Sequence, residues 1–466
     1  MHEHLPLSRA IRHIVPILVF GALLTLSFSI YVLIPKIVSR PISDPRLVTL
    51  IMIIVSWITY LALIRTIAHA AEISAKRLSV IIMVLAAIIY CALAVQPPSQ
   101  SQDLYWHLLV TKGSVVYHQD PYLTKPNELL SDPWAPSVLG WRNSQTTHGP
   151  LWVTLLSGIV ALSPTSLIGA YSLVKLLFAL VLCLCLLLWR SIIQPHVQKK
   201  DLPVLLGVMA FNPLLLQHVL IDGHSDILVM AGILVSYFCL QKMKFTSSIA
   251  ALILAGSVKF IPWILLPIPI FVLWRSSASR WSKLRTTLFS IACGSLLFAV
   301  MYAPYGWTAL NPPGLITEMT IRGETSSMLP GSLLLSALFH LSVTQLRIAG
   351  TLLFGVTMAY FLYRQKITHA YVIPILVLFF WGTSWFMSWY ILWVLLLLPF
   401  LVSTRGFLLI TLLVACSSFG ITSMCFIALY GMISKAWLFE RHLLFRRAWF
   451  QQEWSLFTSP PMVKIR

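Results

Sequence analysis

The sequence predicts an all-α integral membrane protein, a polytopic bundle of about 11–13 transmembrane helices with a large polar loop on one side. Of its 466 residues, 58% are hydrophobic and only 10% are charged, against roughly 25% charged in soluble domains. Apolar runs near the ~20 residues that a spanning helix needs follow one another along the chain. A single segment, residues 102–150, interrupts them and is mostly polar and aromatic.

The charge of the chain fits a membrane protein better than a nucleic-acid-binding one. Its formal net charge is +19, but most basic residues fall in short loops between apolar runs, where they set the orientation in the bilayer. We therefore expect the lipid bilayer as a partner and no nucleic acid. The seven cysteines all lie in apolar runs without zinc-ligand spacing, so we expect core residues and neither disulfides nor metal ligands.

The N-terminal region, residues 1–95, is expected to cross the membrane near 14–34, 47–68 and 78–95. No small-residue cleavage site follows the first apolar run, which therefore reads as an anchor. Arg65, Lys76 and Arg77 place the loop between the second and third spans in the cytoplasm. The loop at 96–165 then faces outward, and its apolar stretch 151–162 is too short to span the membrane, so we expect it along the outer interface.

The transmembrane core is expected over residues 166–433. Its predicted spans lie near 167–189, 203–220, 226–240, 286–302, 346–363, 370–381, 389–402 and 406–433, with an outer segment at 303–344. Between Lys244 and Arg275 the chain must cross an even number of times, so we expect two short helices that turn near Lys259 and Pro262 beside a cavity. Strict alternation places the basic tail, 434–466, outside, whereas its charges favour the inside.

Asp103 is the candidate catalytic residue, because it begins the outer loop at the membrane boundary. If the segment is helical, His107 lies on the same face four residues later and can contact the same substrate. A partly desolvated carboxylate can act as a general base toward a sugar hydroxyl. The alternative is an aspartate that caps an interfacial helix.

Other candidate substrate-binding residues lie in the outer loops. Tyr122 and His148 belong to turn-then-aromatic patterns, and rings there can stack on sugars or anchor the chain at the interface. Asp222, His224 and Asp226 form a short polar cluster, for which we favour hydrogen bonds to substrate over a metal ion. We expect no cofactor and no metal.

Two cations are candidates for binding a lipid-linked phosphate. Lys259 interrupts an apolar run, and an ionised lysine near the bilayer centre costs about 2.5–3.5 kcal/mol, so it needs a partner or a task. Snorkelling from a short helix is the alternative. Arg322, in the later outer segment, could bind phosphate through its bidentate guanidinium.

Several motifs in order along residues 100–400 carry a resemblance. They are DLYW (103–106), DPY (120–122), HGPLW (148–152), NPL (212–214) running into GHSD (223–226), and WYILW (389–393). Together the chain resembles the polyprenol-phosphate-mannose-dependent mannosyltransferases of the GT-C superfamily. The resemblance implies a GT-C-like helical bundle, an inverting transferase that uses a polyprenyl-phosphate sugar on the outer face, and an acid early in the first large outer loop as the base, which maps to Asp103. His148 replaces an aromatic residue and Ser225 an asparagine, so the sugar and acceptor stay open.

We therefore expect a multi-pass plasma-membrane enzyme that moves a hexose, with mannose favoured, from a polyprenyl-phosphate donor to a lipid-linked or cell-envelope glycan acceptor. A transporter or flippase of polyprenyl-linked glycans is the alternative from another class, although we find one broken hairpin and no matching half. A lipid-linked glycan polymerase or ligase is a third option, and it would use a diphosphate-linked donor.

Overall fold

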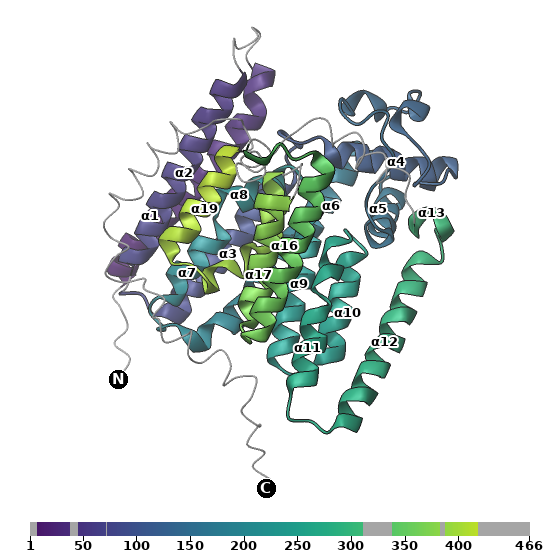
Figure 1. Ribbon diagram of the computed structural model, residues 1–466. Coiled ribbons are helices and arrows are strands. Elements are labelled where there is room, and N and C mark those ends of the chain that lie inside the picture. Colours follow the sequence, from purple (N-terminus) through teal and green to yellow (C-terminus); the bar gives the residue numbers. More distant parts are fainter. Residues whose placement is uncertain (1–6, 38–44, 71, 311–337, 383–386, 418–466) are drawn as a thin grey trace.

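The structure, a computed structural model, describes residues 7–37, 45–70, 72–310, 338–382 and 387–417, which form helices and connecting loops without a strand (Figure 1). Seven helices within these ranges are long and apolar enough to cross a membrane. The prediction of an all-α polytopic membrane protein is therefore confirmed. The finer count of about 11–13 spans stays a prediction.

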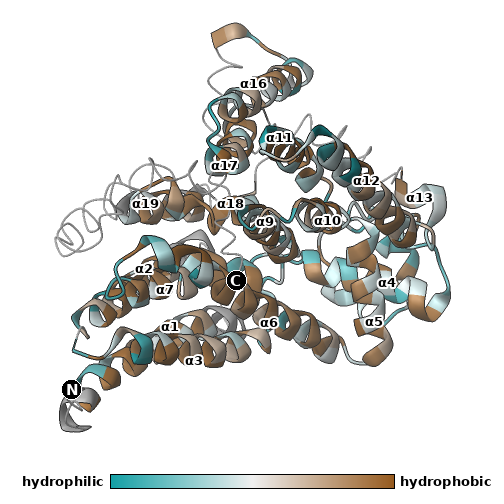
Figure 2. Ribbon diagram, turned by 90° about the horizontal axis from the view of Figure 1, so that it is seen from below, coloured by the Kyte–Doolittle hydropathy of each residue, from teal (hydrophilic) through white to brown (hydrophobic). Residues whose placement is uncertain are grey.

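The three N-terminal spans lie close to where the sequence predicts them. They are α1 (Leu7–Ile37), α2 (Pro45–His69) and α3 (Ala75–Ala94). Helix α1 packs against both α2 and α3. Many residues of α1 and α3 are hydrophobic (Figure 2), and several of them, such as Leu18 and Ile88, are exposed, as expected of helices in contact with lipid.

The centre of the bundle is the segment Leu202–Ile221, whose apolar residues are all buried inside the protein. It begins as α7 (Leu202–Ala210), breaks at Asn212, and continues through the short α8 (Pro213–Leu215) into the π-helix η4 (Leu216–Ile221). The Asn212 side chain caps the new turn by accepting a hydrogen bond from the Leu214 amide at 3.1 Å. A buried break of this kind marks a functional region more often than a defect.

The helices around this centre follow the predicted order up to residue 275. They are α6 (Leu167–Ile193), α9 (Asp226–Gln241), α10 (Phe245–Gly256), η5 (Ile261–Leu265) and α11 (Pro267–Arg275). The pair α10 and α11 is the predicted hairpin of two short helices, and its turn contains Lys259 as expected. Helix α9 packs against α6 and α10, so it connects the hairpin to the rest of the bundle.

The remaining elements are mostly helical as expected. They are α12 (Arg280–Tyr302), α13 (Gly306–Leu310), α16 (Val343–Tyr363), α17 (Ile367–Val377), η6 (Leu378–Gly382), η7 (Ser388–Ile391), α18 (Leu392–Leu395), η8 (Leu398–Phe400) and α19 (Thr404–Ser417). The single helix predicted near 389–402 is wrong, because η7, α18 and η8 are three short turns. Pro399 has no amide hydrogen to donate to the carbonyl of residue 395, so one α-helical hydrogen bond is missing at the end of this segment.

The outer segment folds into helices that pack on one end of the bundle. It contains α4 (Asp103–Tyr117), η1 (Pro126–Leu129), η2 (Ala135–Ser137) and α5 (Pro150–Leu162), and α4 packs against α5 and α6. Figure 1 places α4 and α5 at the upper end, beyond the tip of α10. The predicted short helix near 151–162 is confirmed as α5, which has 13 residues.

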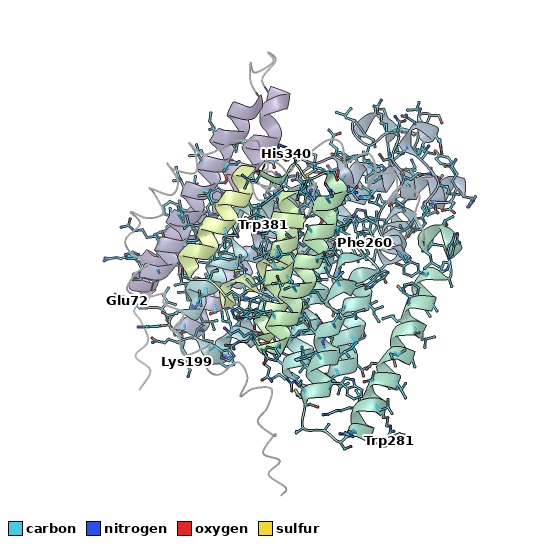
Figure 3. All side chains as sticks on the ribbon, viewed as in Figure 1. Glu72, Lys199, Phe260, Trp281, His340 and Trp381 are labelled. Atoms are coloured by element: carbon cyan, nitrogen blue, oxygen red, sulfur yellow. The ribbon has the colours of Figure 1, made fainter. Side chains whose placement is uncertain are left out.

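The loops that the sequence predicts to be cytoplasmic lie at the end of the bundle opposite to the outer segment. In Figure 3, Glu72, Lys199 and Trp281 lie at the lower ends of the helices that they flank, whereas Phe260 and His340 lie at upper ends. The basic loops therefore share one side of the bundle, and the outer segment with the Lys259 turn lies on the other.

Part of the prediction falls outside the described residues. Arg322 lies there, as do the basic tail at 434–466, most of the outer segment 303–344 and the later part of the span expected near 406–433.

Candidate active site

The first outer segment and the short acidic loop meet through Asp222. Its Oδ1 accepts hydrogen bonds from the backbone amides of Ser99, Gln100 and Ser101 at 3.4, 2.9 and 3.3 Å. Its Oδ2 accepts another from Gln217 Nε2 at 3.0 Å. The side chain is 1% exposed, so this carboxylate is committed to holding the approach to α4 in place.

Asp103 is the first residue of α4, and its carboxylate points toward the acidic loop. Oδ1 accepts a hydrogen bond from Trp141 Nε1 at 2.9 Å, and Oδ2 lies 3.9 Å from His224 Nδ1. The Asp103 side chain is 24% exposed, whereas those of Asp222 and Asp226 are 1% and 0% exposed. Of these three carboxylates, Asp103 is therefore the one that a substrate can reach.

His107 lies one turn further along α4, as predicted, but it faces inward. It is buried against His148 and Trp152, with ring centroids 4.2 and 5.9 Å away. Burial, together with the charge of Lys259, lowers the pKa of His107 to about 3. The imidazole is therefore neutral, and His107 and half-buried His148 form one wall of the site.

His224 forms the opposite wall with the WYILW motif. Its ring stacks on Trp389, with centroids 3.9 Å apart and planes 17° apart. Burial, with His218, Lys259 and His107 nearby, holds the pKa of His224 well below its usual range. The sequence resemblance grouped these two motifs, and the structure brings them into contact across more than 160 residues of chain.

Lys259 has a protein partner, which the sequence did not identify. Its Nζ donates to Asp226 Oδ2 at 2.7 Å and lies 5.5 Å from the centre of the Tyr390 ring. The other oxygen of Asp226 accepts a hydrogen bond from Trp393 Nε1. Because both oxygens are used and the side chain is 0% exposed, Asp226 positions Lys259 and is not placed to contact a sugar directly.

At two glycine positions in the site motifs, the structure leaves no room for a larger side chain. Gly223 has φ +74°, and a Cβ there would lie 2.6 Å from a methyl carbon of Leu104. Gly149 lies so close to the Lys259 turn that a Cβ would be 2.3 Å from the Ser257 carbonyl oxygen. The amides of Gly149 and Leu151 donate to Val258 and Ser257 at 2.9 and 3.0 Å, which ties the start of α5 to that turn.

A buried ion pair stabilises the outer segment that carries Asp103. Lys112 Nζ lies 2.7 Å from Asp132 Oδ2 and 4.2 Å from the centre of the Trp134 ring, and Tyr117 donates to the same carboxylate at 2.8 Å. Burial alone would raise the pKa of Asp132, but the bonds from Lys112, the Trp134 amide and Tyr117 lower it on balance. Sequence analysis missed this pair, although the helical run of α4 contains its lysine.

One predicted site residue lies elsewhere, and a second falls outside the described residues. Tyr122 is buried in a separate cluster with Val153 and Tyr302, and its ring centre is 5.6 Å from that of Tyr305. Arg322, as noted above, lies outside the described residues.

His218 is the main residue that sequence analysis missed. It lies in the π-helix η4, where its Nε2 is 2.8 Å from Ser388 Oγ and its Nδ1 is 3.5 Å from Asp222 Oδ2. The four-residue spacing between His218 and Asp222 is the only sequence signal that could have paired them.

Comparison with known proteins identifies a family. The sequence model of the family described as Alpha-(1->6)-mannopyranosyltransferase, N-terminal domain, matches residues 38–275, which is just over half of the chain. The matched region includes Asp103, the acidic loop and Lys259. No curated protein and no solved structure matches the chain. Asp103, His224 and Lys259 thus lie within the matched region, whereas Trp389 lies beyond it, and the chain belongs to the alpha-(1->6)-mannopyranosyltransferase family of glycosyltransferases.

Proposed function

We propose that the protein transfers mannose from a polyprenyl-phosphate carrier to a hydroxyl of a lipid-linked or cell-envelope glycan, with Asp103 as general base. The observation that carries this assignment is the exposure of Asp103 in a cluster whose other two carboxylates are buried and hydrogen-bonded. A general base must reach the proton that it removes, and Asp103 is the carboxylate here that an acceptor can approach.

The surroundings of Asp103 support this role. Trp141 holds one carboxylate oxygen, so the other is directed toward the acidic loop. Burial lowers the pKa of both His107 and His224, so these rings are uncharged near neutral pH. Asp103 is then the group in this wall of the site that carries the negative charge needed to attract a hydroxyl proton.

The proposed reaction is a single displacement. The acceptor oxygen attacks the anomeric carbon of the mannose while Asp103 takes up the hydroxyl proton. The bond between that carbon and the phosphate oxygen breaks, and polyprenyl phosphate leaves with the electron pair. Asp222 and Asp226 are buried and bonded to other groups, so neither is available as a covalent nucleophile, which favours inversion at the anomeric carbon.

Lys259 is the proposed partner of the departing phosphate. Its side chain is 15% exposed although its Nζ is paired with Asp226, so the Lys259 side chain is not fully enclosed by the protein. A fixed charge at the point where negative charge develops is a major source of catalysis in a site of low dielectric constant. Arg322 is a second candidate for this contact.

The aromatic and polar walls are the proposed binding surfaces for the sugar. Half-buried Trp389 stacks on His224 with one face of its indole, and half-buried His148 lies beside His107. Aromatic faces pack well against the apolar faces of sugar rings. We place this site on the outer side of the plasma membrane, because the basic loops share the opposite end of the bundle.

The test compares Asp103→Asn with the intact protein and with Glu128→Gln, an exposed acid of the same outer segment. Each purified protein is incubated with polyprenyl-phosphate mannose carrying radiolabelled sugar and with a membrane glycolipid extract. We expect product from the intact protein and Glu128→Gln, and a loss of at least 10²-fold in Asp103→Asn with donor binding retained.

Retained turnover in Asp103→Asn would remove Asp103 from the role of base. A parallel incubation with a diphosphate-linked glycan donor separates the proposal from a polymerase or ligase. Transfer from that donor alone would overturn the proposed carrier.

A further inference from the structure

Three side chains that can ligate a metal converge beside Asp103. One ligand atom from each of His218, Asp222 and His224 lies within 4.8 Å of the other two, and all three residues are buried. This set differs from the cluster visible in sequence, because Asp226 is committed to Lys259 and His218 takes its place.

The two histidines present unused nitrogen atoms inside the protein. His218 Nδ1 and His224 Nε2 are buried and make no hydrogen bond to any residue that the structure describes, and the two side chains are only 4% and 3% exposed. A buried polar atom without a partner destabilises the folded state, so two such atoms from rings in contact require an explanation. An ion that accepts the lone pairs of both nitrogen atoms would provide that explanation.

The remaining polar atoms of the three residues are held as they are around metal sites. His218 Nε2 is hydrogen-bonded to Ser388, which leaves Nδ1 as the ligand atom. Asp222 has three backbone amides on one oxygen and Gln217 on the other, which still has a free lone pair. Such outer bonds fix the orientation and tautomer of metal ligands.

We propose that His218, Asp222 and His224 bind a divalent transition-metal ion, with zinc as the best fit. Two imidazoles and one carboxylate suit Zn²⁺ and its first-row neighbours, whereas Mg²⁺ and Ca²⁺ prefer sites made of oxygen. With bonds of about 2.0–2.1 Å, two ligands of a tetrahedral zinc are about 3.4 Å apart. The separation of His218 Nδ1 from Asp222 Oδ2, 3.5 Å, already matches that value.

The ion would connect two parts of the site. With Nε2 of His224 on the metal, the proton of that ring resides on Nδ1, which faces Asp103 Oδ2 at 3.9 Å. Three protein ligands leave one coordination position for an oxygen, as catalytic zinc sites do. That this oxygen belongs to the donor phosphate rests on the proposed transferase function, whereas binding of the ion itself does not.

The experiment measures metal binding in the full-length protein with no donor present. Protein freed of its affinity tag is stripped with chelator, dialysed against Zn²⁺ or Co²⁺, and analysed for metal per chain and for the visible absorption of tetrahedral Co²⁺. We expect one ion per chain and a Co²⁺ band. Asp222→Asn and His218→Gln should each bind at least tenfold more weakly, and Ser388→Ala about 10–100-fold more weakly.

His107→Gln is the matched control, a buried histidine of the same site that lies outside the three ligands. It should keep the full metal content. Because metal content is measured with no donor and no transfer step, failure of this proposal can be distinguished from failure of the proposed base. Equal metal in the intact protein, Asp222→Asn and His218→Gln would overturn the site. Absence of a Co²⁺ band in the intact protein would overturn it as well, even if the ligand variants fail to fold.

Discussion

Replacing Lys259 by methionine separates the structural and catalytic contributions of its ion pair. In the intact protein the Asp226 side chain is 0% exposed, and without Lys259 the Trp393 indole is its remaining side-chain partner among the described residues. Removing one member of a buried pair costs about 3–5 kcal/mol, because the other charge stays buried without compensation. We expect Lys259→Met to lose about this much free energy of unfolding and also to lose transfer.

The double variant Lys259→Met with Asp226→Asn distinguishes the two effects. Asparagine keeps an oxygen for the Trp393 N–H group and carries no charge, so most of the lost stability should return. Transfer should not return, since the charge that faces the leaving phosphate is still missing. By analogy with removal of one donor to a developing oxyanion, we expect the rate to stay about 10²–10³-fold below that of the intact protein.

The free energy of unfolding is measured by titrating the detergent-solubilised protein with SDS and following tryptophan fluorescence. Transfer is measured with radiolabelled polyprenyl-phosphate mannose. Lys242→Met, an exposed lysine that follows α9, is the control and should change stability by no more than about 0.5 kcal/mol. Full transfer by the double variant would refute the leaving-group role. An unchanged free energy of unfolding in Lys259→Met would refute the expected cost of leaving Asp226 buried without its ion-pair partner.

Two further predictions concern the walls of the site. Gly223→Ala should lower the free energy of unfolding by about 1–3 kcal/mol, because its φ is +74° and the new methyl group would meet Leu104. Gly140→Ala, where a Cβ meets nothing within 4 Å, should leave the free energy of unfolding unchanged in the same SDS titration. Equal losses of stability in Gly223→Ala and Gly140→Ala would contradict the expected strain at Gly223. Burial lowers the pKa of His107 to about 3, so the unfolded chain takes up its proton first as the pH falls below about 6.5. Stability should therefore drop by about 1.4 kcal/mol per pH unit from this residue, and His107→Gln should show a shallower dependence between pH 7 and 5; an identical slope in both proteins would rule the effect out.

Much of the fold is predictable because the bilayer permits few alternatives. Spans such as α2 and α3 must be long, apolar and helical, so composition and length identify them. The short hairpin with Lys259 at its turn is also predictable, since basic loops at both ends require an even number of crossings. The broken segment at 388–400 is not, because a run of leucines and tryptophans reads as a continuous helix.

Individual residues of the site were predictable from the sequence, but the contacts between them were not. Asp103, His224 and Lys259 stand out in sequence as polar residues among apolar ones. Their partners come from contacts between distant residues, such as Trp393 with Asp226, 167 positions apart. His218 was missed because its position depends on a π-helix, and one extra residue per turn rotates every later side chain in a way that α-helical spacing does not predict.

The bonds between the start of α5 and the Lys259 turn have a mechanical consequence. They run between backbone atoms, from the Gly149 and Leu151 amides to the carbonyls of residues 258 and 257, so the two segments are joined without any side chain between them. A displacement of one segment must move the other or break both bonds. A lipid carrier that shifts Lys259 on arrival would therefore pull the beginning of α5 with it, and the enclosure around an incoming glycan would change shape as the carrier docks.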